Sequence, residues 1–227
     1  MARLNLTAEG PTEQAFAFQV LRPHLAPHAV YLAKPRCTAL CRRKGRVHRG
    51  GMNRYLPVKN DIVRWLREDQ SADSFFTTMI DLYGLPRDFP GYGRAETTDD
   101  PYKRIAVLED ALGEDIGDQR FIPHIQLHEF EALLFADPSA FASYYHRHRR
   151  EIGELLVISA TFESPELIDD GEQTAPSKRI AKIIPEYSAA KPTAGPIIAA
   201  HIGLETIRAK CSHFDRWLTR LEGLANP

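Results

Sequence analysis

Short apolar segments alternate with helix-compatible segments along the first part of the chain, and this alternation constrains the fold more than any other feature. The strand-like segments are residues 3–8, 29–33, 75–80 and 121–127. Each is followed by sequence with apolar residues at helical spacing, by a helix-capping residue or by a helix-compatible proline. Such an order is typical of an α/β fold in which most strands are parallel. We therefore predict an open, mostly parallel sheet flanked by helices.

The remainder of the chain predicts a different organisation. Beyond about residue 152 the pattern becomes helical and irregular, and 227 residues are few for two independent domains. We predict an α/β core at residues 1–150 and a mainly helical C-terminal extension at residues 151–227, packed on the core. No apolar run reaches the roughly 20 residues of a membrane span, no signal core opens the sequence, and three cysteines are too few for a disulfide scaffold. We expect a cytoplasmic protein without a membrane segment, and its oligomeric state stays open.

Basic residues are concentrated in one stretch. Residues 14–60 contain ten Lys or Arg and no Asp or Glu, although the whole chain has a net charge of −1. Such a stretch on an otherwise acidic chain favours contact with a polyanion, and a solvated loop is the alternative. If the partner is nucleic acid, we expect the phosphate contacts to come from Arg36, Arg42, Arg43, Lys44, Arg46, Arg49 and Arg54.

Acidic residues follow three of the predicted strands. Glu9 follows the first strand, Asp81 the third, and Glu129 and Glu131 the fourth, while Glu13 lies one helical turn after Glu9. The carboxyl ends of parallel strands share one edge of a sheet, where functional groups gather. Converging carboxylates repel unless protons or cations neutralise them, and their oxygens suit Mg²⁺ or Mn²⁺. The alternative is that each acid caps a helix or pairs with an arginine.

Two sets of motifs carry a resemblance to known families. Residues 6–13 (LTAEGPTE) resemble the first motif of Toprim domains, the metal-dependent fold of topoisomerases, primases and OLD-type nucleases, and residues 78–86 (TMIDLYGLP) lie where the second acidic motif occurs. Over nearly the whole chain the sequence is more similar to the uncharacterised domain-of-unknown-function family 4276. The residues that carry this resemblance are 9–13 (EGPTE), 81–86 (DLYGLP), 126–135 (QLHEFEALLF), 174–179 (TAPSKR) and 207–218 (IRAKCSHFDRWL).

The resemblance implies a Toprim-like fold and a divalent-metal site. Carried onto this chain, the metal ligands are Glu9, Glu13, Asp81 and Glu129 or Glu131. Toprim enzymes have Asp-x-Asp after the third strand, whereas this chain has Asp81-Leu82-Tyr83, so the second carboxylate is absent and one metal or two are both possible.

The function expected from these observations is Mg²⁺- or Mn²⁺-dependent hydrolysis of phosphodiester bonds in DNA or RNA. Glu9, Asp81 and Lys178 are the expected catalytic residues, with Lys178 neutralising charge in the transition state. An exposed helix-start lysine is the alternative for Lys178. Resemblance to OLD-type nucleases also implies an ATPase partner and a role in phage defence. A non-catalytic regulatory or nucleic-acid-binding subunit with a degenerate metal site is the alternative function, and primase-like synthesis is a third.

Residues near the C-terminus could also suggest a nucleophilic site. Cys211 and His213 lie two residues apart beside Phe214 and Trp217. We interpret this segment as the packed start of a helix.

Overall fold

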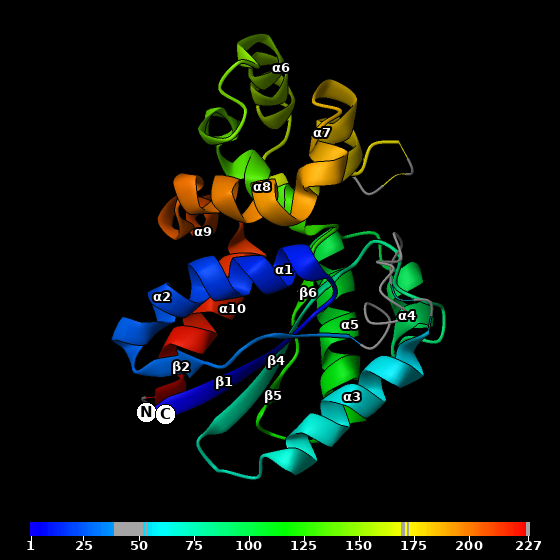
Figure 1. The fold of residues 1–227 in the computed structure, drawn as a ribbon. Coiled ribbons are helices and arrows are strands. Elements are labelled where there is room, and N and C mark those ends of the chain that lie inside the picture. Colours follow the sequence, from blue (N-terminus) through cyan, green and yellow to red (C-terminus); the bar gives the residue numbers. More distant parts are fainter. Residues whose placement is uncertain (39–51, 53, 169–170, 172, 226–227) are drawn as a thin grey trace.

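The computed structural model describes residues 1–227 except 39–51, 53, 169–170, 172 and 226–227 (Figure 1). Its centre is a six-stranded sheet, and every pairing among the described strands is parallel. The strand order is β2-β1-β4-β5. In addition, β3 pairs with β1, and β6 pairs with β4. The predicted mostly parallel sheet with flanking helices is confirmed. The strands are β1 Ala2–Ala8, β2 Val30–Leu32, β3 Arg36–Cys37, β4 Ser74–Asp81, β5 Phe121–Ile122 and β6 Ile125–Gln126.

Helices cover both faces of this sheet and form a further layer above one of its ends (Figure 1). The C-terminal region is helical, as predicted. The α-helices are α1 Pro11–Phe16, α2 Arg22–Leu25, α3 Tyr55–Glu68, α4 Tyr92–Glu96, α5 Pro101–Ile116, α6 Arg149–Ser159, α7 Pro176–Ile183, α8 Tyr187–Ile202, α9 Leu204–Lys210 and α10 Ser212–Glu222. The π- and 3₁₀-helical segments are η1 Ala17–Leu21, η2 Ala26–His28, η4 Phe130–Ala136, η5 Pro138–Ser143, η6 Pro165–Leu167 and η7 Gly223–Ala225.

Two hydrophobic clusters hold the layers together, one on each side of the sheet. Leu4 and Leu6 of β1 belong to a cluster with α1, α8, α9 and α10. Phe76 and Ile80 of β4 belong to the other, with α3 and α5. Successive side chains of a strand point to opposite faces, so a sheet covered on both sides needs apolar residues at nearly every position. This is why β4 is an almost continuous apolar segment.

The C-terminal helices pack directly on the sheet. The Trp217 indole N–H of α10 donates a hydrogen bond to Thr77 Oγ1 of β4 at 2.9 Å. One hydrophobic cluster contains residues from both the predicted core and the predicted extension. The division at residue 150 stays a prediction. None of the described helices combines the length and apolarity that crossing a membrane requires.

The fourth predicted strand, residues 121–127, is interrupted. It forms β5 and β6, with Pro123 and His124 between them. Proline has no N–H to donate to the ladder, and here Thr78 Oγ1 of β4 donates to the His124 carbonyl at 2.8 Å. The predicted helix after Glu129 is present, but as the 3₁₀-helix η4, and every residue of η4 is buried.

Helices α1 and α8 approach closely at Gly195. A Cβ atom added to Gly195 would lie 3.0 Å from the Phe130 ring, 3.2 Å from Thr12 and 3.3 Å from the Tyr187 hydroxyl. Phe130 and Tyr187 are fully buried, so they have little room to move. The absence of a side chain at Gly195 therefore sets the distance between α1 and α8.

We expect Gly195→Ala to lower the free energy of unfolding by about 1–3 kcal/mol, the usual cost of overpacking. Gly153→Ala in α6 is the matched control, because a Cβ there meets nothing within 4 Å. It should raise stability by about 0.5–1 kcal/mol through better helix propensity. Urea denaturation of the three proteins measures both effects. Equal stability of Gly195→Ala and wild type would contradict the close contact.

Candidate functional site

The strand order reverses between β1 and β4. From β1 the chain first adds β2 on one side, and it then returns to add β4 and β5 on the other. Ligands of open α/β sheets bind at such a reversal, outside the carboxyl ends of the strands. Glu9 follows β1 directly and Asp81 is the last residue of β4, so both lie at this point.

Glu9 and Asp81 are joined through the backbone. The Asp81 N–H donates to Glu9 Oε2 at 2.8 Å, and the Glu9 N–H donates to the Met79 carbonyl at 2.9 Å. The carboxylate of Asp81 accepts from the Phe130 N–H at 3.0 Å. These contacts link the ends of β1 and β4 to the start of η4.

Glu13 folds back onto the start of its own helix. Its Oε2 accepts a hydrogen bond from the Gly10 N–H at 2.8 Å, and the side chain is buried. Burial, and then the charges of Glu9 and Glu131, raise the pKa of Glu13 to about 8. The spacing of one helical turn thus brings Glu13 to the same place as Glu9.

A tight turn aims Glu129 and Glu131 at this edge of the sheet. His128 has a φ of 63°, a left-handed conformation that costs a residue other than glycine on the order of 1 kcal/mol. The His128 carbonyl accepts from the Tyr83 N–H at 2.9 Å, which holds the turn against the loop after β4. The sequence left open which of the two acids faces the site. Both are buried there.

Two C-terminal helices complete the cluster. At the start of α7, the Ser177 N–H donates to Glu129 Oε2 at 2.8 Å, and its hydroxyl to Oε1 at 3.1 Å. From α8, the Tyr187 hydroxyl donates to Glu131 Oε1 at 3.2 Å, and Lys191 Nζ pairs with the same oxygen at 3.1 Å.

The electrostatics show that the acids form one group, defined here as the acidic cluster of Glu9, Glu13, Asp81, Glu129 and Glu131. The pKa of Asp81 is well above its usual range, because of burial first and then the charges of the other four acids. Burial and Glu131 raise the pKa of Glu129, while Ser177 and Lys191 oppose the shift. Burial lowers the pKa of Lys191, but Glu131, Glu129 and Asp81 outweigh it and leave the pKa raised.

The donor set of the acidic cluster suits a hard divalent cation. All five side chains offer oxygen, the ligand type that Mg²⁺ and Mn²⁺ prefer. The acids are more widely spaced than in a preformed site. Among the described residues, the sets of three potential ligands within 4.8 Å of one another are His24–His28–Glu222 and Glu109–His124–His213. An ion held by three acids of the cluster would therefore draw their side chains together.

The sequence did not single out three residues that contact the cluster. Lys191 and Tyr187 lie one helical turn apart in α8, but that segment carries no recognisable motif. Ser177 lies in the TAPSKR segment, next to Lys178, for which the sequence predicts a catalytic role. Lys178 is exposed, and none of the described hydrogen bonds or ion pairs joins it to the cluster. A catalytic role for Lys178 stays a prediction.

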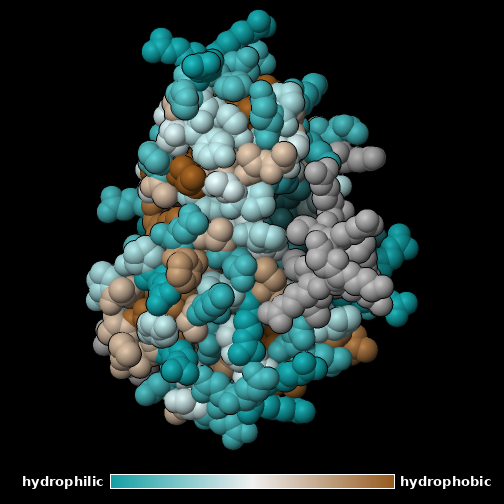
Figure 2. Space-filling view, in the orientation of Figure 1, coloured by the Kyte–Doolittle hydropathy of each residue, from teal (hydrophilic) through white to brown (hydrophobic). Residues whose placement is uncertain are grey.

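The basic stretch is described only in part. Arg42, Arg43, Lys44, Arg46 and Arg49 lie outside the described residues. Arg54 is exposed directly before α3. Figure 2 shows that the described surface on this face is mostly hydrophilic, with a recess between the α7–α8 layer and the half that contains the sheet. Nucleic-acid binding by these residues stays a prediction.

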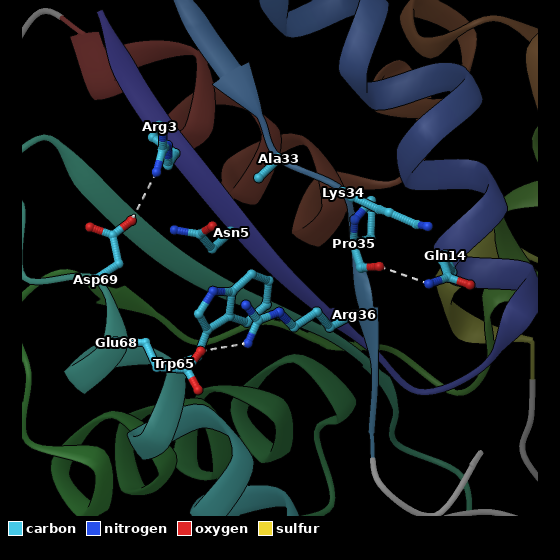
Figure 3. Close-up of a pocket in the computed structure, with 10 residues that line it drawn as sticks. All are labelled: Arg3, Asn5, Gln14, Ala33, Lys34, Pro35, Arg36, Trp65, Glu68 and Asp69. Carbon is cyan, nitrogen blue, oxygen red and sulfur yellow. Dashed lines mark hydrogen bonds and ion pairs between the residues drawn. The ribbon is translucent and has the colours of Figure 1, made fainter.

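Arg36 lines a separate pocket of about 840 Å³ beside β1 and α3 (Figure 3). Its guanidinium lies 4.0 Å above the centre of the Trp65 ring and pairs with Glu68 at 3.0 Å. On the same pocket, Arg3 pairs with Asp69 at 3.4 Å. Arg36 is therefore held by stacking and pairing, and a phosphate would have to compete with Glu68 for it.

Comparison with known proteins shows the family. Residues 8–222 match the family described as a domain of unknown function (DUF4276), and the chain belongs to that family. No significant match occurs among the curated proteins or among the solved structures.

The raised pKa of Glu13 makes stability depend on pH. Between pH 4.5 and about 8 the native protein keeps a proton on Glu13 that the unfolded chain has released, so stability falls as pH rises. In EDTA, Glu13→Gln should reduce this fall by on the order of 2–4 kcal/mol, because glutamine cannot ionise.

Urea denaturation at pH 5 and pH 8 measures this change. Glu205→Gln, at an exposed position of α9, is the control. Its free energy of unfolding should fall between pH 5 and pH 8 by as much as that of the wild type. If the free energy of unfolding of Glu13→Gln fell by as much as that of the wild type, the burial of an ionisable Glu13 in the cluster would be contradicted.

Proposed function

We propose that this chain is a divalent-metal-dependent, nuclease-like enzyme that hydrolyses phosphodiester bonds of DNA or RNA. The observation that carries the proposal is the convergence of five acids from three strand ends at the reversal of the strand order. Their mutual repulsion is relieved by a cation, and their oxygens match Mg²⁺ or Mn²⁺. The resemblance of residues 6–13 and 78–86 to Toprim motifs supports the same reading.

The residues of the chain have distinct roles in this proposal. Glu9 and Asp81 would hold the cation, with Glu13, Glu129 and Glu131 completing its surroundings. A bound divalent cation activates water and stabilises the charge that develops on phosphate oxygens. Ser177 fixes the carboxylate of Glu129 through two hydrogen bonds. Phosphate contacts by the basic stretch would make substrate binding dependent on salt.

Lys191 is a second candidate for charge neutralisation, beside Lys178. In the part of the chain that the structure describes, it pairs with the acidic cluster through Glu131 at 3.1 Å. A cation placed next to the reacting phosphate stabilises the negative charge of a transition state. When a metal binds the carboxylates, Lys191 could turn from Glu131 towards the phosphate.

A regulatory or nucleic-acid-binding subunit without catalysis is the second candidate function. Tyr83 stands where Toprim enzymes carry the second acid of Asp-x-Asp, and it is partly exposed. Lys191 already neutralises Glu131, which lowers the need for a second metal. An ATPase partner and a role in phage defence, implied by resemblance to OLD-type nucleases, extend either candidate.

Cleavage of single- and double-stranded DNA and RNA is the direct test. With Mn²⁺ or Mg²⁺ we expect the wild type to cut at least one substrate and EDTA to abolish cutting. Asp81→Asn should lower the rate by at least about 100-fold, because it weakens the metal site, whereas Asp110→Asn, exposed on α5, should cut normally. Absence of cutting by the wild type, with metal binding intact, would favour the non-catalytic subunit.

The two lysines can be separated by substitution. If Lys191 supplies the positive charge, Lys191→Met should lower kcat by about 10–100-fold, and Lys178→Met should leave it within about twofold. Single-turnover cleavage measures both. The reverse result would assign the role to Lys178. Thermal denaturation of both variants is the control, since loss of the Glu131 pair should also lower stability by about 1–3 kcal/mol.

A further inference from the structure

A second group of metal-ligating side chains lies inside the protein, apart from the acidic cluster. Glu109 comes from α5, His124 from the connection between β5 and β6, and His213 from the first turn of α10. Glu109 Oε1 lies 3.0 Å from His213 Nε2 and 3.6 Å from His124 Nδ1. We propose that Glu109, His124 and His213 form a structural binding site for Zn²⁺ or a similar transition-metal ion.

The hydrogen bonding of this group is incomplete in a way that points to a ligand. Both ring nitrogens of His124 and the Nδ1 atom of His213 are buried without a hydrogen-bond partner from the described protein. His124 and His213 are 1% and 4% exposed. A buried polar group without a partner destabilises the folded state, so three in one place call for a compensating interaction. A metal ion held between Glu109 Oε1, His213 Nε2 and His124 Nδ1 would accept the lone pair of His124 Nδ1, one of the three unpaired atoms.

The distances between the ligand atoms are close to those around a zinc ion. Zinc lies about 2.0–2.2 Å from imidazole nitrogen and carboxylate oxygen, so tetrahedral ligand atoms are separated by roughly 3.3 Å. The two observed separations from Glu109 Oε1 lie on either side of this value. Two imidazoles and one carboxylate form a known three-ligand set for zinc, in which a water molecule takes the fourth position.

Gln126 extends the site. Its amide oxygen is buried without a hydrogen-bond partner among the described residues. Burial, and then His213, hold the pKa of the His124 ring well below its usual range, and Gln126 opposes this shift. A metal-bound imidazole normally donates its other N–H to an oxygen acceptor, which orients the ring. Gln126 is the acceptor suited to this role for His124.

The proposed ion would have a structural role, because its two histidine ligands are buried and its three ligands come from different elements of the fold. Neither histidine is open to a substrate, and the three ligands come from a helix on one face of the sheet, from the sheet edge and from the C-terminal helix on the other face. An ion held by all three would bind only the folded chain and would stabilise it by mass action.

The other histidine group is a weaker candidate. At His24–His28–Glu222, the carboxylate oxygen that contacts His24 at 2.7 Å also accepts from Arg208 at 2.9 Å. His28 is exposed. A guanidinium beside the carboxylate opposes the binding of a second cation, so this surface group serves as the control.

Trp217 provides a reporter of the proposed site. The His124 ring stacks on Trp217 at 4.1 Å and on His213 at 4.9 Å, with an angle of 15° between the two imidazoles. A metal ion prefers to lie in the plane of each ring that binds it, so binding must tilt these parallel rings. The tilt should change the fluorescence of Trp217.

Titration of the full, untagged and metal-stripped chain with Co²⁺ in excess Mg²⁺ is the test, because Mg²⁺ saturates carboxylate sites and has little affinity for imidazole. We expect one equivalent of Co²⁺ to give visible absorption bands of a tetrahedral site and to alter tryptophan fluorescence. Zn²⁺ should displace the Co²⁺ and raise the midpoint of thermal denaturation.

Three variants identify the ligands. Glu109→Gln keeps an acceptor for the Ile125 N–H, which Glu109 binds at 2.8 Å, and should weaken Co²⁺ binding by about 100-fold or more. His213→Gln should do the same, and His28→Ala at the surface group should bind as the wild type does. Absence of the bands in the wild type would overturn the proposal even if a variant failed to fold. Unchanged bands in Glu109→Gln, or their loss in His28→Ala, would overturn it equally.

Discussion

Repulsion among five carboxylates at one edge of the sheet is the constraint on which the rest of the site depends. Buried acids of like sign raise one another's pKa and oppose folding unless protons, cations or hydrogen-bond donors neutralise them. In this chain the donors are mainly backbone N–H groups, at Gly10, Asp81, Phe130 and Ser177. Lys191 adds one positive charge. These donors hold the acids in place, and the raised pKa of Glu13, Asp81 and Glu129 shows that their charges still repel one another, a state that favours the binding of a divalent cation.

The C-terminal helices are part of this site as well as of the core. Helix α7 presents the two donors of Ser177 to Glu129, and α8 presents Tyr187 and Lys191 to Glu131. Their position depends on the close contact of α8 with α1 at Gly195. Packing in the core thus sets the geometry of the acidic cluster. Helix α10 likewise brings His213 against Glu109 and His124.

Particular residues show how far the sequence could predict this structure. The strand ends at Glu9 and Asp81 were predictable, because an alternating segment typical of a strand precedes Glu9 and an uncharged, β-branched and aromatic segment typical of a buried strand precedes Asp81. Glu13 followed from helical spacing. The break at Pro123, the 3₁₀ geometry of η4 and the left-handed His128 were not predictable, since they depend on hydrogen bonds to β4 and to the loop after it. Ser177, Tyr187 and Lys191 carry no local signal, because their partners are 48, 56 and 60 residues away in the chain.

The sequence by itself determined the class of fold, because the class depends on strand periodicity. It also determined the edge of the sheet where the acids gather, because parallel connections bring the carboxyl ends of the strands to one edge. The type of cation that the acids suit followed from residue type. Only the tertiary structure decided that Glu129 and Glu131 both face this edge, that Lys191 contacts the cluster while Lys178 is exposed, and that Glu109 meets two histidines inside the protein. Those contacts join residues far apart in the chain, and long-range packing, which local sequence does not specify, brings them together.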